Sequence, residues 1–418
     1  MNRKQLIILL VLVAIVGGAG LVLFKRNDES WSPSDTKLGQ KLLDKFQVND
    51  VARIHIKGDN KDLNLVKKDD LWRVEERGDY PANFSTISDF LLKAAELKIT
   101  QVEPIGESQL ERLELLEPSK SLKSGTLVEL KDAKGNNLQA VLLGKKHVKK
   151  MERAPQFQYG GDEFADGRYV MLKSDPKNVI LISDALSTAD PKAESWLNKD
   201  FFKVEKLKSV SFVSTNATNS WKASRETENG SWSVADVKAG ESFDTNKLAA
   251  LGNSLNSPSF ADVVANGKPE ETGLDHPLLL TLGTFDQFTY TLKVGKKNAE
   301  GNYNVNVAVA AELPKERMPG KDEKPEDKTK LDKEFNDKKQ ALADKLKQEQ
   351  ALEKWTYLVP SWSLDPLLKA RHELMVEKKE EPKADSADAE PIDPAAIPAL
   401  KKAPAPKVAP APKKVSTP

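Results

Sequence analysis

Hydrophobic and polar residues alternate along short segments between residues 49 and 202. Ile54 and Ile56 alternate with the polar residues around them, which is the pattern of a half-buried strand. The alternation or its apolar equivalent predicts strands at residues 51–57, 63–66, 71–74, 126–130, 138–143, 168–172 and 179–182. A helical period interrupts the strands, because Ile87, Phe90 and Leu91 fall on one face of a helix that Ser85 is expected to cap.

The same order of elements recurs between residues 203 and 378. Strands are predicted at residues 210–213, 221–224, 231–234, 278–282, 288–294, 303–309 and 356–359, with one helix after Asp244. Trp72 and Trp232 occupy matching places and are expected to fill the two cores. The recurrence predicts an α+β fold of two homologous units, 49–202 and 203–378, each an antiparallel or mixed sheet packed with one or two helices.

The second unit is longer than the first because it carries an insertion at residues 312–354, rich in charges of both signs. Its apolar residues form an imperfect helical stripe: Leu331, Phe335, Leu342, Leu346 and Leu352. The pattern predicts a helical arm or hairpin. The stripe has two interpretations, docking on a partner's helix as in a coiled coil or packing on its own domain.

Residues 5–24 form a segment without charged side chains, and the segment is long enough for a helix that crosses a membrane. They predict an N-terminal anchor at residues 1–26, followed by a linker at 27–48, with the bulk of the chain extracytoplasmic at the inner membrane. The alternative is a cleaved signal peptide, because Gly18-Ala19-Gly20 offers small residues for cleavage. Residues 379–418 are rich in Pro, Ala and Lys and predict a disordered tail.

Composition excludes several functions. The 418 residues include no cysteine, so disulfides, zinc–thiolate sites and cysteine nucleophiles are excluded. A net charge of +1 argues against a dedicated nucleic-acid binder. The four histidines are widely separated, none of the familiar catalytic motifs is present, and no metal, cofactor or catalytic residue is predicted.

Two strand ends carry the same tripeptide, Gly144-Lys145-Lys146 and Gly295-Lys296-Lys297. We expect the glycine to supply a turn position with positive φ. The lysines have two interpretations, contact with an anionic glycan or lipid headgroup, or protection of a sheet edge against aggregation. Trp362 follows the last strand and is expected to be more exposed than Trp72 and Trp232.

Several segments together resemble a bacterial family catalogued as domain of unknown function 4340. The resemblance rests on Leu71-Trp72-Arg73-Val74, Tyr80-Pro81-Ala82-Asn83, the segment 196–202 and Thr272-Gly273-Leu274-Asp275-His276-Pro277, and it covers residues 49–378 in two copies. The resemblance implies one N-terminal span and a gene beside components of a gliding-motility-type ABC transporter.

We therefore expect a non-enzymatic accessory or scaffold subunit of an ABC-type transport or envelope complex. Its partners would be membrane proteins such as ABC-transporter subunits, reached through the arm and through exposed sheet edges. The alternative is a module that binds an envelope polymer, peptidoglycan or an anionic glycan, through the Gly-Lys-Lys segments, exposed aromatic residues and the basic tail.

Overall fold

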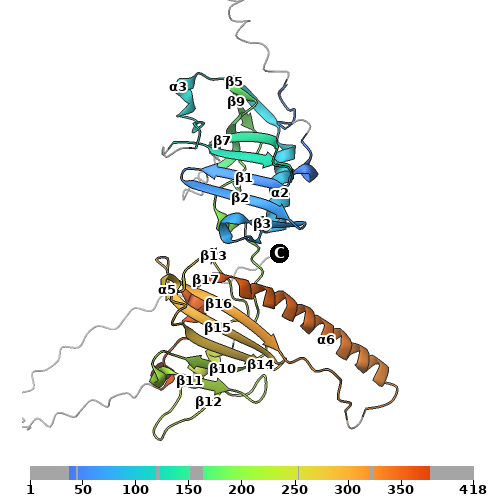
Figure 1. The fold of residues 1–418 in the computed structure, drawn as a ribbon, viewed down its shortest axis with the longest axis vertical. Coiled ribbons are helices and arrows are strands. Elements are labelled where there is room, and N and C mark those ends of the chain that lie inside the picture. Colours follow the sequence, from blue (N-terminus) through green and yellow to red (C-terminus); the bar gives the residue numbers. More distant parts are fainter. Residues whose placement is uncertain are drawn as a thin grey trace, which may run out of the picture. The chain divides into compact units, whose positions relative to one another are not determined.

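The structure is a computed structural model, and it describes residues 37–43, 46–118, 123–150, 163–252, 254–320 and 323–376 (Figure 1). The predicted anchor at residues 1–26 and the predicted tail at 379–418 lie outside these ranges. Within them, no helix combines the length and the apolar character that a membrane crossing requires.

The first sheet has nine strands in the order β4-β3-β2-β1-β6-β7-β8-β9-β5, and neighbours pair antiparallel. The strands are β1 (Arg53–Gly58), β2 (Lys61–Lys68), β3 (Leu71–Val74), β4 (Tyr80–Pro81), β5 (Ile99–Pro104), β6 (Thr126–Lys131), β7 (Asn137–Lys150), β8 (Glu163–Leu172) and β9 (Asp175–Ile182). Two helices, α2 (Phe84–Glu96) and α3 (Glu107–Leu110), accompany them.

The second sheet has eight strands in the order β12-β11-β10-β14-β15-β16-β17-β13. The strands are β10 (Leu207–Val213), β11 (Trp221–Ser224), β12 (Ser233–Val234), β13 (Asp262–Val264), β14 (Leu278–Thr284), β15 (Phe288–Lys297), β16 (Asn302–Ala311) and β17 (Thr356–Pro360). Its helices are α4 (Thr245–Leu251), α5 (Pro269–Thr272), α6 (Lys328–Gln350) and α7 (Ser361–Leu364). Short 3-10 turns complete the two units: η2 (Val48–Asp50), η3 (Glu75–Arg77), η4 (Ala193–Ser195), η5 (Ala217–Asn219), η6 (Ala351–Lys354) and η7 (Arg371–Leu374).

The two sheets have the same strand order once β4 is set aside. In each, three strands precede a helix, the next strand crosses to the far edge, and a central meander follows. The residue that caps this helix also makes an equivalent backbone hydrogen bond in both units. Asn83 donates its backbone N–H to Trp196 O (2.7 Å), and Asp244 donates its N–H to Leu374 O (2.9 Å). The expectation of an α+β fold is confirmed, with antiparallel sheets.

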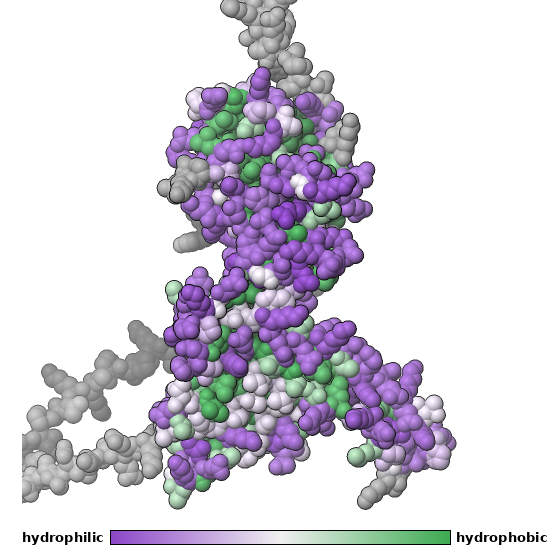
Figure 2. Space-filling model, in the orientation of Figure 1, coloured by the Kyte–Doolittle hydropathy of each residue, from purple (hydrophilic) through white to green (hydrophobic). Residues whose placement is uncertain are grey.

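The strand alternation places the core where the sequence predicts it. Ile54, Ile56, Leu63 and Leu65 are fully buried, and each such side chain contributes about 1.5–3 kcal/mol through its removal from water. Ile87, Phe90, Leu91 and Ala94 of α2 pack on this sheet. Figure 2 shows hydrophilic residues over most of the visible face of the described chain.

The observed elements differ from the predicted ones at the start of helix α2 and at the edge strands. Helix α2 begins two residues before the predicted start, because Asn83 is its N-cap and accepts from Thr86 N–H (3.2 Å), so the prediction of Ser85 as the cap was wrong. Edge strands β4, β5 and β13 are too short or too polar to show a clear alternation.

Candidate functional site

The Gly-Lys-Lys segment of the second sheet ends its strand at Lys297, as predicted, whereas β7 of the first sheet continues beyond its segment to Lys150. β7 and β15 continue through Gly144 and Gly295. In each strand the register shifts at this point, between Leu143 and Lys146 and between Val294 and Lys297, so that each segment forms a β-bulge.

The expected positive φ is absent from both glycines, and that prediction was wrong. The requirement for glycine comes from a crossing segment. A Cβ atom at Gly144 would collide with Leu113 O, and one at Gly295 would collide with Thr272 O. The Lys145 N–H donates to Leu113 O (2.8 Å), which fixes the crossing in the first unit.

The four lysines belong to two different sheets, and the second pair contacts the protein itself. Lys296 Nζ donates to Glu270 O (3.0 Å). Lys297 Nζ lies 3.4 Å from Asp365 Oδ1 and 4.7 Å from the centre of the Tyr303 ring. In the first sheet, Lys145 is exposed and Lys146 is half-buried. Trp362 is 67% exposed on α7, as expected.

The apolar stripe of the insertion faces its own domain. The insertion forms helix α6, and its residues Leu342 and Leu346 pack against the second sheet's core. Phe335 and Leu342 line a cavity of about 200 Å³ together with Phe285 and Pro314. Leu331, one helical turn before Phe335, is half-buried. The interpretation in which the stripe packs on its own domain therefore describes the observed contacts.

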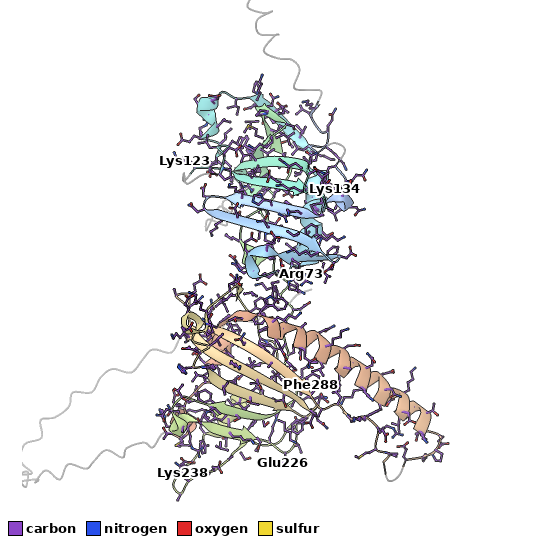
Figure 3. The ribbon with its side chains drawn as sticks, viewed as in Figure 1. Arg73, Lys123, Lys134, Glu226, Lys238 and Phe288 are labelled. Atoms are coloured by element: carbon purple, nitrogen blue, oxygen red, sulfur yellow. The ribbon has the colours of Figure 1, made fainter. Side chains whose placement is uncertain are left out.

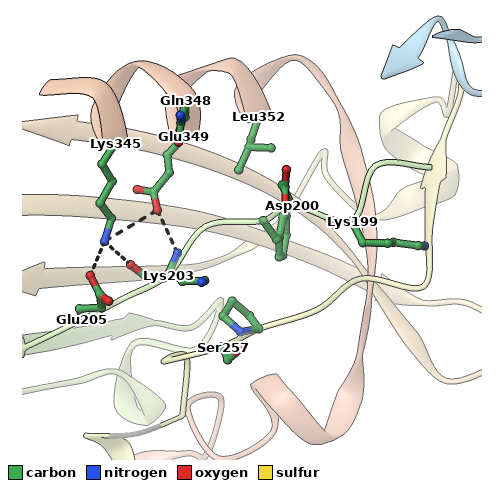
Figure 4. Close-up of a pocket in the computed structure, with 11 residues that line it drawn as sticks. Lys199, Asp200, Lys203, Glu205, Ser257, Lys345, Gln348, Glu349 and Leu352 are labelled. Atoms are coloured by element: carbon green, nitrogen blue, oxygen red, sulfur yellow. Dashed lines mark hydrogen bonds and ion pairs between the residues drawn. The ribbon is translucent and has the colours of Figure 1, made fainter. Parts of the chain in front are cut away.

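A cleft of about 480 Å³ with charged residues in its lining lies beside α6 (Figure 4). Three segments form it: the chain that leads into β10, the chain before β13, and the C-terminal half of α6. The lining residues are Lys199, Asp200, Phe201, Lys203, Glu205, Ser257, Pro258, Lys345, Gln348, Glu349 and Leu352.

A buried carboxylate holds the wall of this cleft together. Glu349 is 6% exposed, and it accepts from Lys203 N–H (3.0 Å) and from the Tyr290 hydroxyl (2.8 Å). Lys345, one turn earlier on α6, donates to Lys203 O (2.9 Å) and to Glu205 (3.0 Å). The contacts of Glu349 and Lys345 with Lys203 and Glu205, dashed in Figure 4, connect α6 to the segment that leads into β10.

Burial raises the pKa values of two groups in this network, Glu349 and Tyr290. Removal from water raises the pKa of the Glu349 carboxyl, although Lys203 N–H and Tyr290 partly offset the effect. The pKa of the Tyr290 hydroxyl is raised by burial and by the neighbouring Glu349 charge. Tyr290 therefore stays a hydrogen-bond donor, and its hydrogen bond to Glu349 holds α6 against the sheet.

Two histidines lie in ion-pair contacts on the first sheet. His55 faces away from the core, as predicted, with its ring nitrogens 2.9 Å from Glu129 and 3.2 Å from Asp62. His147 Nδ1 lies 2.6 Å from Asp166 Oδ1. In the ranges that the structure describes, no three His, Asp or Glu side chains are placed to share a metal ion.

The sequence reasoning missed Glu349 and Tyr290. Tyr290 carried a usable signal, because Phe288, Tyr290 and Leu292 alternate along β15 and must point into the core. Glu349 carried none, since it is one charged residue among many in the insertion.

Comparison with known proteins gives one match. The family model described as "Domain of unknown function (DUF4340)" matches residues 72–277. The match begins in β3 of the first sheet and ends directly before β14 of the second, so it covers parts of both units. No curated protein and no solved structure matches the chain.

Proposed function

On the premise that this chain belongs to the family of the domain of unknown function 4340 through residues 72–277, we propose that it is a non-enzymatic scaffold subunit of an ABC-type transport or envelope complex. In this proposal residues 5–24 anchor the chain in the inner membrane and the two units lie outside the cytoplasm. The units are two copies of one domain, which is supported by their shared strand order and by the equivalent ties at Asn83 and Asp244.

The fixed position of α6 is the observation that carries the proposal. The C-terminal half of the helix is held by Glu349, Lys345 and Leu346, whereas Figure 1 shows its N-terminal end extending beyond the sheet. A helix of 23 residues is about 34 Å long. Lys338 Nζ, in the middle of the helix, also donates to Asp286 (2.9 Å). A rigid element of this length, held along its inner face, is suited to contact with another protein.

The outward face of α6 is charged, and it lies away from the apolar stripe that the sequence indicated. Lys333, Asp337, Asp344 and Lys347 recur at helical spacing and are all exposed. Charged side chains of both signs favour a polar, orientation-specific contact over a coiled-coil seam. We therefore assign partner contact to this charged face of α6.

Mild crosslinking of membranes, followed by affinity capture of the chain, tests the proposal. ABC-transporter subunits should be recovered with the wild-type chain and lost with the double variant Lys333→Glu and Lys347→Glu. Lys134→Glu is the matched control. Lys134, labelled in Figure 3, is exposed in the turn between β6 and β7 of the first sheet. If no transporter subunit is recovered with any of the three proteins, the assignment to a transport complex is wrong.

Binding of an envelope polymer is the second candidate, and one observation favours it. Trp362 is 67% exposed, and Tyr303 lies nearby in the chain's fold, since its hydroxyl donates to Asp365 (2.9 Å) just after α7. Exposed aromatic rings are surfaces on which sugars stack. Cosedimentation with peptidoglycan should fall with Trp362→Ala, and substitution of Lys145 and Lys146 tests the lysine contribution. Equal sedimentation of all variants would remove this candidate.

A further inference from the structure

A second hollow, of about 500 Å³, lies at the N-terminal end of α2 in the first unit. It shares Asp200 with the cleft at α6, and the rest of its lining is different. Its lining residues are Asp70, Leu71, Trp72, Pro81, Ala82, Asn83, Phe84, Ser85, Asn198 and Asp200.

Two large apolar side chains in this hollow face solvent. Leu71 is 56% exposed at the start of β3, and Phe84 is 68% exposed at the start of α2. Single exposed apolar residues are common on protein surfaces, but two that share one hollow form a patch that loses contact with water when it is covered. Each side chain of this size contributes about 1.5–3 kcal/mol when it is fully buried.

The backbone around the two side chains is held in place. Asn83 N–H donates to Trp196 O (2.7 Å), and Asn198 N–H donates to Pro81 O (2.9 Å). Trp72, beneath the hollow, is only 7% exposed. The patch is therefore presented on a preformed floor, which lowers the entropic cost of binding.

The charged side chains that line the hollow are both acidic. Its lining includes the carboxylates Asp70 and Asp200 and neither lysine nor arginine. Lys67 lies 3.1 Å from Asp70, but the Asp70 side chain is 95% exposed, so water screens this pair. At the N-terminus of α2, the Asn83 side chain accepts from Thr86 N–H, so this first-turn donor is already bound.

We propose that this hollow docks a segment of a partner protein in which an apolar side chain stands beside a lysine or arginine. The apolar side chain covers Leu71 and Phe84, and the cation is placed toward Asp70 and Asp200. This surface goes beyond the contact proposed for α6, because it lies on the other unit and selects its partner by a different chemistry.

The test uses two synthetic peptides, acetyl-Leu-Lys-Leu-Lys-amide and acetyl-Leu-Glu-Leu-Glu-amide, added to the isotope-labelled protein. The basic peptide should shift the NMR signals of Leu71, Phe84 and the Trp72 indole, and the acidic peptide should not. Phe84→Ala should weaken binding of the basic peptide about tenfold, which corresponds to about 1.4 kcal/mol. Leu92→Ala is the matched control, because Leu92 is 51% exposed on the same helix and does not line the hollow.

The charge requirement is tested separately. The double variant Asp70→Asn and Asp200→Asn should weaken the basic peptide about threefold and reduce the dependence of binding on salt. Equal binding of both peptides, or equal binding by Phe84→Ala and Leu92→Ala, would overturn the proposal. So would self-association that Phe84→Ala abolishes, or binding to neutral lipid vesicles through the same residues, since a second copy or a membrane would then be the occupant.

Discussion

The Tyr290 hydroxyl donates to Glu349 Oε2 over 2.8 Å and so joins the first part of β15 to the last turn of α6. The two residues are 59 positions apart in the chain, and both are buried. Through this contact a strand whose position follows from simple alternation fixes the direction of a helix whose sequence is mostly charged.

Removal of the Glu349 carboxylate should destabilise the second unit. Glu349→Ala leaves the Lys203 N–H without its acceptor, and an unsatisfied buried donor costs about 1–3 kcal/mol. Glu349→Gln should cost less than Glu349→Ala, because the amide oxygen accepts from Lys203 and the amide nitrogen donates to the Tyr290 oxygen. Urea unfolding of the three proteins measures the difference. An alanine variant as stable as the wild type would show that the network does not hold α6.

The pair formed by Glu241 and Arg371 predicts a pH dependence. Hydrogen bonding to Arg371 (2.7 Å) holds the pKa of the Glu241 carboxyl at about 2, below its ordinary value of 4.5. Because the folded pKa is the lower one, the stabilisation is fully present above pH 4.5 and is lost as the pH falls toward 2.

Glu241→Gln should therefore lower the melting temperature at pH 6 and have a vanishing effect near pH 2. Melting curves of the variant and the wild type across this range provide the measurement. Glu226→Gln is a suitable control, since Glu226 lies in the exposed turn after β11. A constant difference between Glu241→Gln and wild type at every pH would contradict the ion-pair explanation.

The two bulge glycines should resist substitution. Alanine at Gly144 or Gly295 collides with a backbone carbonyl, Leu113 O or Thr272 O, and overpacking of this kind costs about 1–3 kcal/mol. Gly106→Ala is the control, because nothing lies within 4 Å of the added Cβ and φ is −71°. Chemical denaturation should rank Gly106→Ala close to wild type, and similar losses for all three variants would refute the crossing-segment explanation.

The tryptophans should differ sharply in their effect on stability. Trp72 is 7% exposed and Trp362 is 67% exposed. Trp72→Ala should cost about 3–5 kcal/mol, whereas Trp362→Ala should change the free energy of unfolding by no more than about 0.5 kcal/mol. Comparable losses from the two substitutions would mean that Trp362 is buried in solution.

The sequence predicts the central strands and α2 well, because one face of each element is buried and the period of the apolar residues records it. Ile54, Ile56 and Phe90 are examples. The order of strands recurs in the two sheets, and Trp362 is exposed as the sequence predicts. The matching positions of Trp72 and Trp232 proved less equivalent than expected, since Trp232 is only half-buried.

The conformation of Gly-Lys-Lys could not be read from local sequence. Glycine is compatible with a positive φ and equally with close approach of another segment, and only the tertiary fold brings Leu113 and Thr272 to these positions. The direction of α6 was hidden for a similar reason. Its apolar stripe shows that one face is covered, but it does not show whether the cover is a partner or the chain's own sheet.

Site-specific photo-crosslinking from α6 tests the central claim, that this helix contacts a partner, most directly. A photoreactive residue at Asp337, on the outward face, should crosslink to a transporter or envelope-complex subunit in intact membranes. The same residue at Lys134, exposed on the first unit, should give far less of that product. A crosslinked species of equal yield at both positions, or none at Asp337, would contradict the assignment of α6 as the contact element.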